Sequence, residues 1–336
     1  MNTRILKLLS VFVMATVASP VLAEGELNIY SARKEALIKP LLDKFAAQYD
    51  IKINLVTGKA DTLIARLQNE GQFSPADVLL TTDVGRLHRA KVLGLTQTID
   101  LASFPKSSFH DPEQHWVALT KRARPIMVAA DRVDPSNITS YEDLTKPEYK
   151  GRICVRSSAN IYNQSMVAAL IAQKGEAYAE AWAKGLVQNF ARKPQGGDRD
   201  QVKAMAAGVC DIALVNTYYL AAMYDADEVQ QTAAKSVTVV WPNQADRGTH
   251  VNISGIAITK HSRNADNARA LVEFMLTPEA QSWYGSANHE YPIDMQITWS
   301  VRLTTFGQFK GEAIAIEQVG QLNAKAVKVM DRAGWL

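Results

Sequence analysis

The chain has 336 residues, of which 47% are hydrophobic and 21% are charged, and its formal net charge is +3. This length is enough for two ordinary domains, each with its own core. Basic and acidic residues are interspersed without a long basic run, so the composition gives no sign of nucleic-acid binding.

Residues 1–23 have the three-part layout of a secretory signal peptide. Arg4 and Lys7 provide a basic start, residues 8–22 are apolar, and the segment ends in the small residue Ala23. The apolar run is shorter than the roughly 20 residues that a membrane-spanning helix needs. We expect cleavage after Ala23 and a mature protein in the periplasm; the alternatives are a retained membrane anchor and an ordinary buried helix.

Strands and helices alternate in the first part of the mature chain. Short β-prone segments occupy residues 27–30, 51–56 and 77–80, and apolar residues recur at helical spacing over 36–49 and 61–69. Such repeated units predict a parallel sheet covered by helices.

A second set of units follows a β-like stretch at residues 116–130. Its predicted strands are 153–155, 212–215, 237–241 and 253–258, and its predicted helices are 164–174, 176–190, 201–207 and 265–276. Because the chain has no flexible polar linker, we expect it to cross between two lobes more than once. The crossings are predicted as short strands near residues 118–126 and 242–252.

The mature chain contains two cysteines, Cys154 and Cys210. Cysteines of exported proteins usually pair, so we expect a structural disulfide between them. A two-cysteine metal or redox site is the alternative, but the pair has no C-x-x-C spacing and neither cysteine has a histidine beside it.

Two consecutive tyrosines, Tyr218 and Tyr219, follow the apolar residues 212–215 in the motif Asn216-Thr217-Tyr218-Tyr219. Loops at the carboxyl ends of sheet strands are where open α/β folds bind ligands. Both phenol groups can face one site only if the backbone bends there, because successive side chains of a strand point to opposite faces. The alternative is that one or both are core aromatics.

A polar segment, residues 157–165, lies between a predicted strand and a predicted helix. A helix N-terminus offers free backbone N–H groups and the positive end of the helix dipole, so the segment can hold an anion; plain helix capping is the alternative. Arg122 and Arg124 alternate along a predicted strand and would project from one face, and Arg33 follows the first strand. These arginines are either partners of an anion in a cleft or ordinary surface and salt-bridging residues.

Phenols, an anion site and arginines together suit a hard trivalent cation. The pKa of free tyrosine is about 10, so a phenolate forms at neutral pH only where positive charge strongly stabilises it. Ferric iron provides that charge, prefers oxygen ligands and is neutralised by three phenolates. Zinc and softer metals favour clusters of histidine, cysteine or methionine, which the chain lacks.

These motifs resemble those of the periplasmic ferric-ion-binding proteins of bacterial ABC transporters. The resemblance is carried by Asn216-Thr217-Tyr218-Tyr219, by residues 158–165 and by Tyr30-Ser31-Ala32-Arg33, and it extends over essentially the whole mature chain. Residues 58–61, 74–78 and 290–292 are also similar to segments of that family.

The resemblance implies an α/β, two-lobed periplasmic binding protein fold of type II, with a transferrin-like cleft and a mixed sheet flanked by helices in each lobe. We place the N-terminal lobe at residues 24–121 and 250–300 and the C-terminal lobe at residues 122–249 and 301–336. The implied function is that of a non-enzymatic carrier, expected to be monomeric, that closes around Fe³⁺ and delivers it to an inner-membrane ABC transporter permease.

The resemblance also implies the site. Tyr162, Tyr218 and Tyr219 match the iron ligands, and a further set matches residues that bind an anion such as carbonate or bicarbonate, or that support the ligands: Arg33, Arg122, Ser158, Asn160 and Asn216. Because all three tyrosines belong to the second lobe, that lobe is expected to bind the ion first.

The chain departs from the family pattern in the first lobe. Many members have a histidine, sometimes followed by a tyrosine, where this chain has Lys34 and Glu35. We therefore predict three tyrosines and a bidentate anion without a histidine, with Glu35 or water as the alternative ligand. Asp83 stands where another subset has a carboxylate, or it caps the following helix.

Two other functions are alternatives. A binding protein of the same architecture would hold a polyamine or a phosphorylated compound between aromatic walls. An exported enzyme is the second alternative, but the sequence has no G-x-S-x-G elbow or H-E-x-x-H helix, and its six histidines are dispersed.

Overall fold

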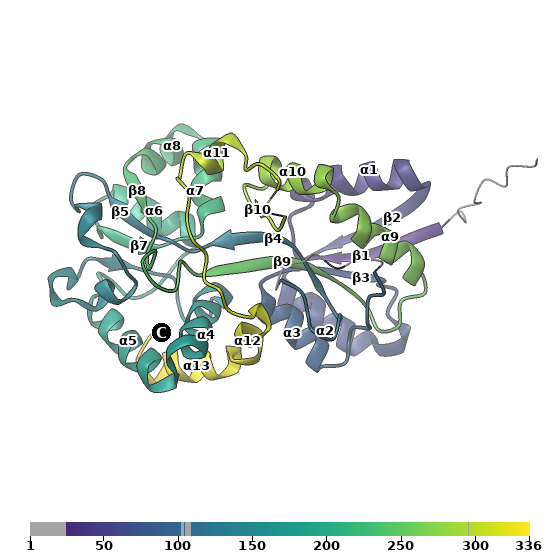
Figure 1. The fold of residues 1–336 in the computed structure, drawn as a ribbon, viewed down its shortest axis with the longest axis horizontal. Coiled ribbons are helices and arrows are strands. Elements are labelled where there is room, and N and C mark those ends of the chain that lie inside the picture. Colours follow the sequence, from purple (N-terminus) through teal and green to yellow (C-terminus); the bar gives the residue numbers. More distant parts are fainter. Residues whose placement is uncertain (1–24, 102–103, 105–108, 295) are drawn as a thin grey trace, which may run out of the picture.

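The computed structural model describes residues 25–336 except 102–103, 105–108 and 295. The predicted signal peptide lies outside the described residues. The described chain forms two lobes, each with a mixed sheet flanked by helices (Figure 1), so the predicted fold class is confirmed. None of the helices in these ranges has the length and apolarity needed to cross a membrane.

The first lobe contains a six-stranded sheet in the order β10-β4-β9-β3-β1-β2. Its strands are β1 (Gly25–Ser31), β2 (Ile51–Thr57), β3 (Val78–Thr82), β4 (Val117–Ala123), β9 (Val251–Ile258) and β10 (Tyr291–Pro292). The three strands for which a parallel arrangement was predicted, β1, β2 and β3, are parallel. The pairings of β4, β9 and β10 are antiparallel, so the sheet is mixed, as the predicted fold class requires. A parallel neighbour needs a crossover connection, whereas β9 enters directly from the other lobe.

Helices cover both faces of this sheet (Figure 1). One face carries α1 (Lys39–Tyr49), α9 (Ala265–Met275) and α10 (Pro278–Ala287), and the other carries α2 (Ala60–Glu70) and α3 (Val84–Val92). Three of the four periodic residues that predicted the first helix, Leu41, Leu42 and Phe45, are buried against the sheet as expected. The fourth, Leu37, is exposed in a short 3-10 helix before α1, which begins at Lys39 and not at residue 36.

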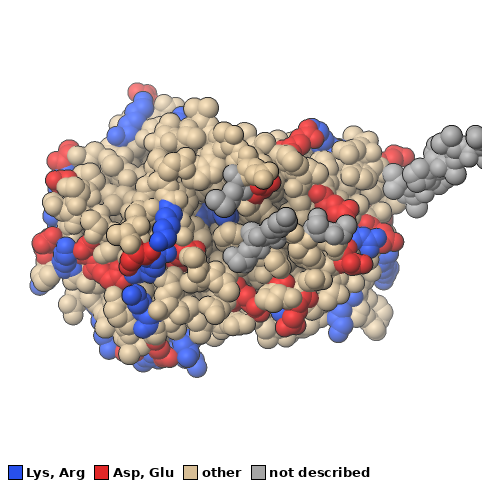
Figure 2. Space-filling model, viewed as in Figure 1, with Lys and Arg blue, Asp and Glu red and all other residues tan. Residues whose placement is uncertain are grey.

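The second lobe contains a four-stranded sheet in the order β6-β7-β5-β8. Its strands are β5 (Ile126–Ala129), β6 (Ile153–Cys154), β7 (Ile212–Leu214) and β8 (Val237–Val240). On one side lie α4 (Ile161–Lys174), α5 (Glu176–Gln188) and α13 (Asn323–Arg332), and on the other lie α6 (Asp198–Ala206), α7 (Thr217–Tyr224) and α8 (Glu228–Lys235) (Figure 1). Charges of both signs intermingle on the face shown in Figure 2.

The described chain crosses between the lobes at three places. The first crossing joins β4 to β5 through Arg124, the second is a turn at residues 241–250, and the third leads from β10 to α11 (Val301–Thr304). The first two lie side by side, because the Arg124 N–H donates to the His250 carbonyl at 3.0 Å. The first crossing is a strand as predicted, whereas most of the second is a turn.

A C-terminal helix also joins the lobes. α12 (Ile316–Gln321) packs against α3 of the first lobe and α4 of the second. Gly320 permits this approach, since a Cβ atom there would lie 2.5 Å from that of His88. The lobes are thus in contact through packed helices as well as through the crossing segments.

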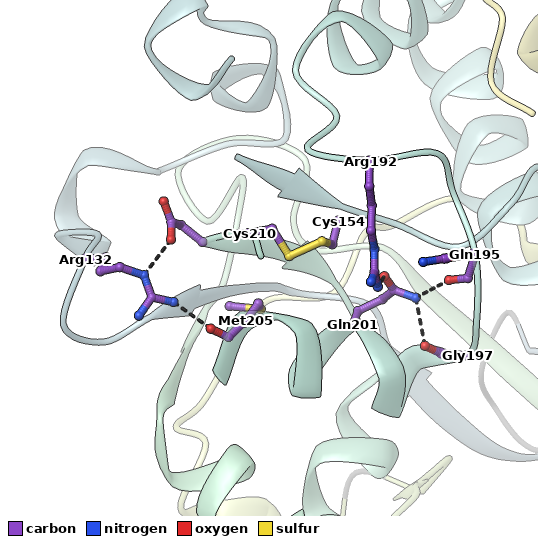
Figure 3. Close-up of a disulfide and its surroundings, with 9 residues drawn as sticks. Arg132, Cys154, Arg192, Gln195, Gly197, Gln201, Met205 and Cys210 are labelled. Atoms are coloured by element: carbon purple, nitrogen blue, oxygen red, sulfur yellow. Dashed lines mark hydrogen bonds and ion pairs between the residues drawn. A yellow bond between two sulfur atoms is a disulfide. The ribbon is translucent and has the colours of Figure 1, made fainter. Parts of the chain in front are cut away.

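Cys154 and Cys210 form the predicted disulfide, which joins β6 to the turn before β7 (Figure 3). Replacing both by serine is expected to lower the free energy of unfolding by about 2–5 kcal/mol, because the bond closes a long loop in the unfolded chain. Urea unfolding of the variant and of the wild type would measure the loss. Reduced wild type is the control and should match the variant; equal stability of the oxidised protein and the variant would contradict the prediction.

Candidate metal and anion site

Tyr218 and Tyr219 lie in the first turn of a helix, α7, which begins at Thr217 directly after β7 and Asn216. Successive residues of a helix are about 100° apart, rather than on opposite faces as in a strand. The two rings therefore lie side by side, with centroids 4.2 Å apart. The bend that the tyrosine pair requires is the start of this helix.

Tyr162 lies in the first turn of α4. This helix begins at Ile161, three residues before the predicted start, so Tyr162 belongs to the helix and not to the preceding loop. Its hydroxyl lies near that of Tyr218 in the same lobe and near Thr82 at the end of β3 in the first lobe. The three tyrosines thus lie in the N-terminal turns of two helices, and Tyr162 is next to a residue of the first lobe.

Arg122 of β4 lies beside the tyrosine rings. Its guanidinium carbon is 5.1 Å from the ring centroid of Tyr162 and 6.0 Å from that of Tyr218. The side chain is only 2% exposed, and its Nη2 donates to the Ile253 carbonyl. Its Nε and Nη1 are buried without a hydrogen-bond partner among the described residues. Unpaired buried donors are costly, and a bound anion would supply the missing acceptor for at least one of them.

The surroundings lower the pKa of one of the three tyrosines and raise the pKa of the other two. Burial alone would raise the pKa of Tyr162, but the charge of Arg122 and the hydrogen bonds from Tyr218 and Thr82 outweigh burial and lower this pKa. Burial and the neighbouring phenols raise the pKa of Tyr218 well above its usual value. Burial, Tyr162 and Asp198 raise the pKa of Tyr219 to about 12. Without a cation, Tyr162 is therefore the first of the three to ionise.

Two further arginines, which the sequence analysis missed, also face the tyrosines. The guanidinium carbon of Arg156 is 5.6 Å from the ring centroid of Tyr162, and that of Arg199 is 5.8 Å from the ring centroid of Tyr219. Arg156 lies between the predicted strand 153–155 and the polar segment 157–165, so its position in the sequence was sufficient to predict it as a site residue. Arg199 lies in the first half of α6 and carries no comparable signal.

Three residues predicted to bind or support an anion lie close to these helix starts. Asn216 precedes α7, and its Oδ1 accepts from Arg124 at 2.9 Å. Asn160 precedes α4, and its Oδ1 is buried without a partner among the described residues. The N–H of Ser158 donates to the Leu336 carbonyl at 3.3 Å.

The end of the described chain closes over the loop that leads to Tyr162. Trp335 is 1% exposed, and its indole Nε1 donates to the Arg156 carbonyl at 3.0 Å. Its ring also lies close to those of Trp182 and Phe190. This loop is therefore held by residues far away in the sequence.

Arg33 is not brought beside the tyrosines. It forms a buried ion pair with Glu290 at 2.6 Å within the first lobe. Glu290 also accepts hydrogen bonds from Thr120 and from Ser254. The ion pair agrees with the salt-bridging alternative for Arg33, but the residue is buried and not on the surface.

The remaining first-lobe candidates are Lys34, Glu35 and Asp83. Lys34 and Glu35 are exposed at the start of a short 3-10 helix, Glu35–Leu37. Asp83 caps α3 by accepting from the Gly85 N–H, and it also accepts from Ser165 at 2.6 Å and Asn252 at 2.9 Å. Its carboxylate is occupied by these contacts, which favours capping over metal binding.

Within the described ranges, no group of three or more histidine, cysteine, aspartate or glutamate residues could hold a metal ion. The donors gathered at this site are phenols with adjacent guanidinium groups, a set that suits a hard cation together with an anion. The geometry thus makes this cluster a candidate site for small ions, with residues from both lobes.

Comparisons with known proteins place the chain in the class of two-lobed solute-binding proteins. Residues 54–299 match the model of the family described as bacterial extracellular solute-binding protein, and the chain belongs to this family. Iron uptake protein A1 of Synechocystis is 41% identical over 316 residues, which cover 93% of this chain and 88% of that protein.

Solved structures give the same result. The Trichodesmium protein IdiA (FutA), in complex with iron and citrate ligands, is 44% identical with a TM-score of 0.89, and the match covers 93% of this chain and all of that one. The ferric binding protein from Campylobacter jejuni is 40% identical with a TM-score of 0.88, over 92% of this chain and all of that one. The resemblance to ferric-ion-binding proteins is confirmed.

Proposed function

We propose that the chain binds Fe³⁺ between its lobes through the phenolates of Tyr162, Tyr218 and Tyr219, with an anion held by Arg122. The observation that carries this proposal is a buried guanidinium with two unpaired nitrogen atoms beside the rings of Tyr162 and Tyr218, with Tyr219 packed against Tyr218. Three phenolates balance the charge of the ion, and a bidentate anion suits the guanidinium fork. The iron-uptake and ferric-binding relatives support this reading.

The anion completes the coordination in place of a histidine or of Glu35. Asn160 and Asn216 lie where α4 and α7 offer their first free N–H groups, and Ser158 supports the same loop. Carbonate or bicarbonate would fit between Arg122 and the metal. Citrate, which is present in the Trichodesmium structure, has the same carboxylate chemistry. Arg33 contributes from a distance by holding Glu290.

In this proposal the protein carries Fe³⁺ and does not catalyse a reaction. The two lobes, residues 24–121 with 250–300 and residues 122–249 with 301–336, move about the crossing segments, except that residues 122–123 complete β4 of the first lobe. The second lobe binds iron before the first closes over it. The protein acts as a monomer in the periplasm after removal of residues 1–23. It delivers the ion to the permease of an ABC transporter, and it has no enzymatic or nucleic-acid-binding role.

An absorption titration of the metal-free mature protein with ferric iron tests the proposal. We expect one equivalent of iron to produce a visible phenolate-to-iron charge-transfer band. The band should require an anion, so parallel titrations without added anion, with bicarbonate and with citrate identify which one serves. A colourless protein that binds a polyamine or a phosphorylated compound would instead support the same-fold alternative.

A further inference from the structure

A buried arginine outside the proposed ligand set joins the two helices that carry the tyrosines. Arg124 is 1% exposed and lies at the crossing between β4 and β5. Its Nη1 donates to Asn216 Oδ1 at 2.9 Å, and its Nη2 donates to Asn163 Oδ1 at 2.6 Å. Asn216 directly precedes α7, and Asn163 lies in the first turn of α4. One guanidinium therefore holds the N-terminal ends of both helices.

The contact through Asn163 extends to the loop before Tyr162. The Nδ2 of Asn163 donates to the carbonyl of Arg156 at 2.9 Å and to that of Ser157 at 3.2 Å. Asn163 therefore links Arg124 both to the first turn of α4 and to the loop that precedes this helix. A change in Arg124 would be felt at Tyr162 although the two side chains are not in contact.

A buried carboxylate balances this charge. Asp198 Oδ1 is 3.4 Å from Arg124 Nη1, and its Oδ2 is 3.6 Å from Arg156 Nη1. Asp198 is itself 1% exposed and lies at the start of α6. The arginine fork therefore binds two amides and one acid in a fixed plane, which a lysine could not reproduce.

The backbone N–H and the backbone carbonyl of Arg124 both form hydrogen bonds. Its N–H donates to the His250 carbonyl, and its carbonyl accepts from the Tyr141 hydroxyl at 2.7 Å. His250 belongs to the second crossing segment, so the framework that fixes Arg124 is the junction between the lobes. The guanidinium projects from this junction onto the helix starts.

We propose that Arg124 is a positioning residue for the metal site, which sets the relative placement of the first turns of α4 and α7 and so of the three phenol groups. This proposal rests on the proposed role of Tyr162, Tyr218 and Tyr219 in binding Fe³⁺. An arginine that merely stabilised the lobe would, on replacement, lower stability and leave the iron complex unchanged.

The test compares Arg124→Gln/Asp198→Asn with Asp198→Asn alone. Because both proteins lack the Asp198 carboxylate, replacing Arg124 leaves no buried carboxylate without its partner. Arg132→Gln is a control at a more exposed arginine, since Arg132 also donates to a carboxylate and a carbonyl, those of Asp211 and Met205, but lies near the disulfide (Figure 3). Each protein is titrated with ferric iron in the presence of citrate, and the thermal midpoint of each metal-free protein is recorded.

We expect the double variant to bind iron about 10- to 100-fold more weakly than Asp198→Asn, with a shifted charge-transfer maximum. Arg132→Gln should bind as the wild type does. Asn163→Ala, which keeps the contact between Arg124 and Asp198, should change the spectrum in the same direction to a smaller extent. Equal affinities and spectra for the double variant and Asp198→Asn would overturn the proposal.

Crystal structures of the metal-free double variant and of metal-free Asp198→Asn keep the two proposals separate. If the wild type formed no coloured complex, the proposed iron site would be wrong. The position of the first turns of α4 and α7 would still decide the role of Arg124: displacement in the double variant supports it, and superimposable helices refute it.

Discussion

Replacing Tyr162, Tyr218 or Tyr219 by phenylalanine is expected to weaken Fe³⁺ binding by more than about 100-fold in each case, beyond the usual effect of residues outside the ligand set. Each change removes a phenolate oxygen and leaves one positive charge of the ion unbalanced, while the ring and its packing remain. The charge-transfer band should weaken and shift in every variant. Absorption titration of the metal-free variants under citrate competition measures both quantities.

Tyr224→Phe is the matched control for these variants. Tyr224 belongs to the last turn of α7, and its hydroxyl donates to the Ala234 carbonyl at 3.1 Å, away from the other tyrosines. It should retain the wild-type band and affinity. If all three site variants behaved like this control, the ligand assignment would be wrong.

Replacing Glu290 by glutamine is expected to lower the free energy of unfolding by about 3–5 kcal/mol, because Arg33 would keep its charge in a buried position without a partner. The two side chains are 7% and 3% exposed, so solvent screens the pair little. Urea unfolding at neutral pH measures the loss. The exposed pair of Lys44 and Glu279 gives the control, since Glu279→Gln should change stability by at most about 1 kcal/mol.

The same pair predicts a pH dependence. Burial alone would raise the pKa of Glu290, but the charges of Arg33 and Arg122 outweigh burial and lower it below its usual value. A carboxylate with a lowered pKa stabilises the fold fully above the pKa of the unfolded chain, and this contribution is lost as the pH falls through the folded value. The wild type should therefore lose stability towards acid more steeply than Glu290→Gln. Parallel pH profiles would contradict this assignment.

Local periodicity was sufficient to predict the first three strands, which the structure places at β1, β2 and β3. It could not predict strand direction, because β4 and β9 take theirs from the crossings between the lobes. It also missed α7: the segment Thr217–Tyr224 is apolar on nearly every face and so lacks a helical pattern. The tyrosine pair was visible in the sequence, but the helix that brings its two rings together was not.

The surroundings of the site depended on contacts between distant residues. The sequence alone could not decide whether Arg33 binds an anion or forms a salt bridge, because its partner Glu290 is 257 residues away in the chain. Asp83 was similarly ambiguous until Ser165 and Asn252 were seen to occupy its oxygen atoms. Arg156 and Arg199 owe their position beside the tyrosines to the packing of α6 and of the loop before α4.

The contact of Trp335 with the loop before Tyr162 bears on the timing of assembly. This loop takes its final hydrogen bonds only after residue 335 has been synthesised and, in an exported chain, translocated. A partly translocated chain therefore lacks a finished site even when both tyrosine-bearing helices have emerged.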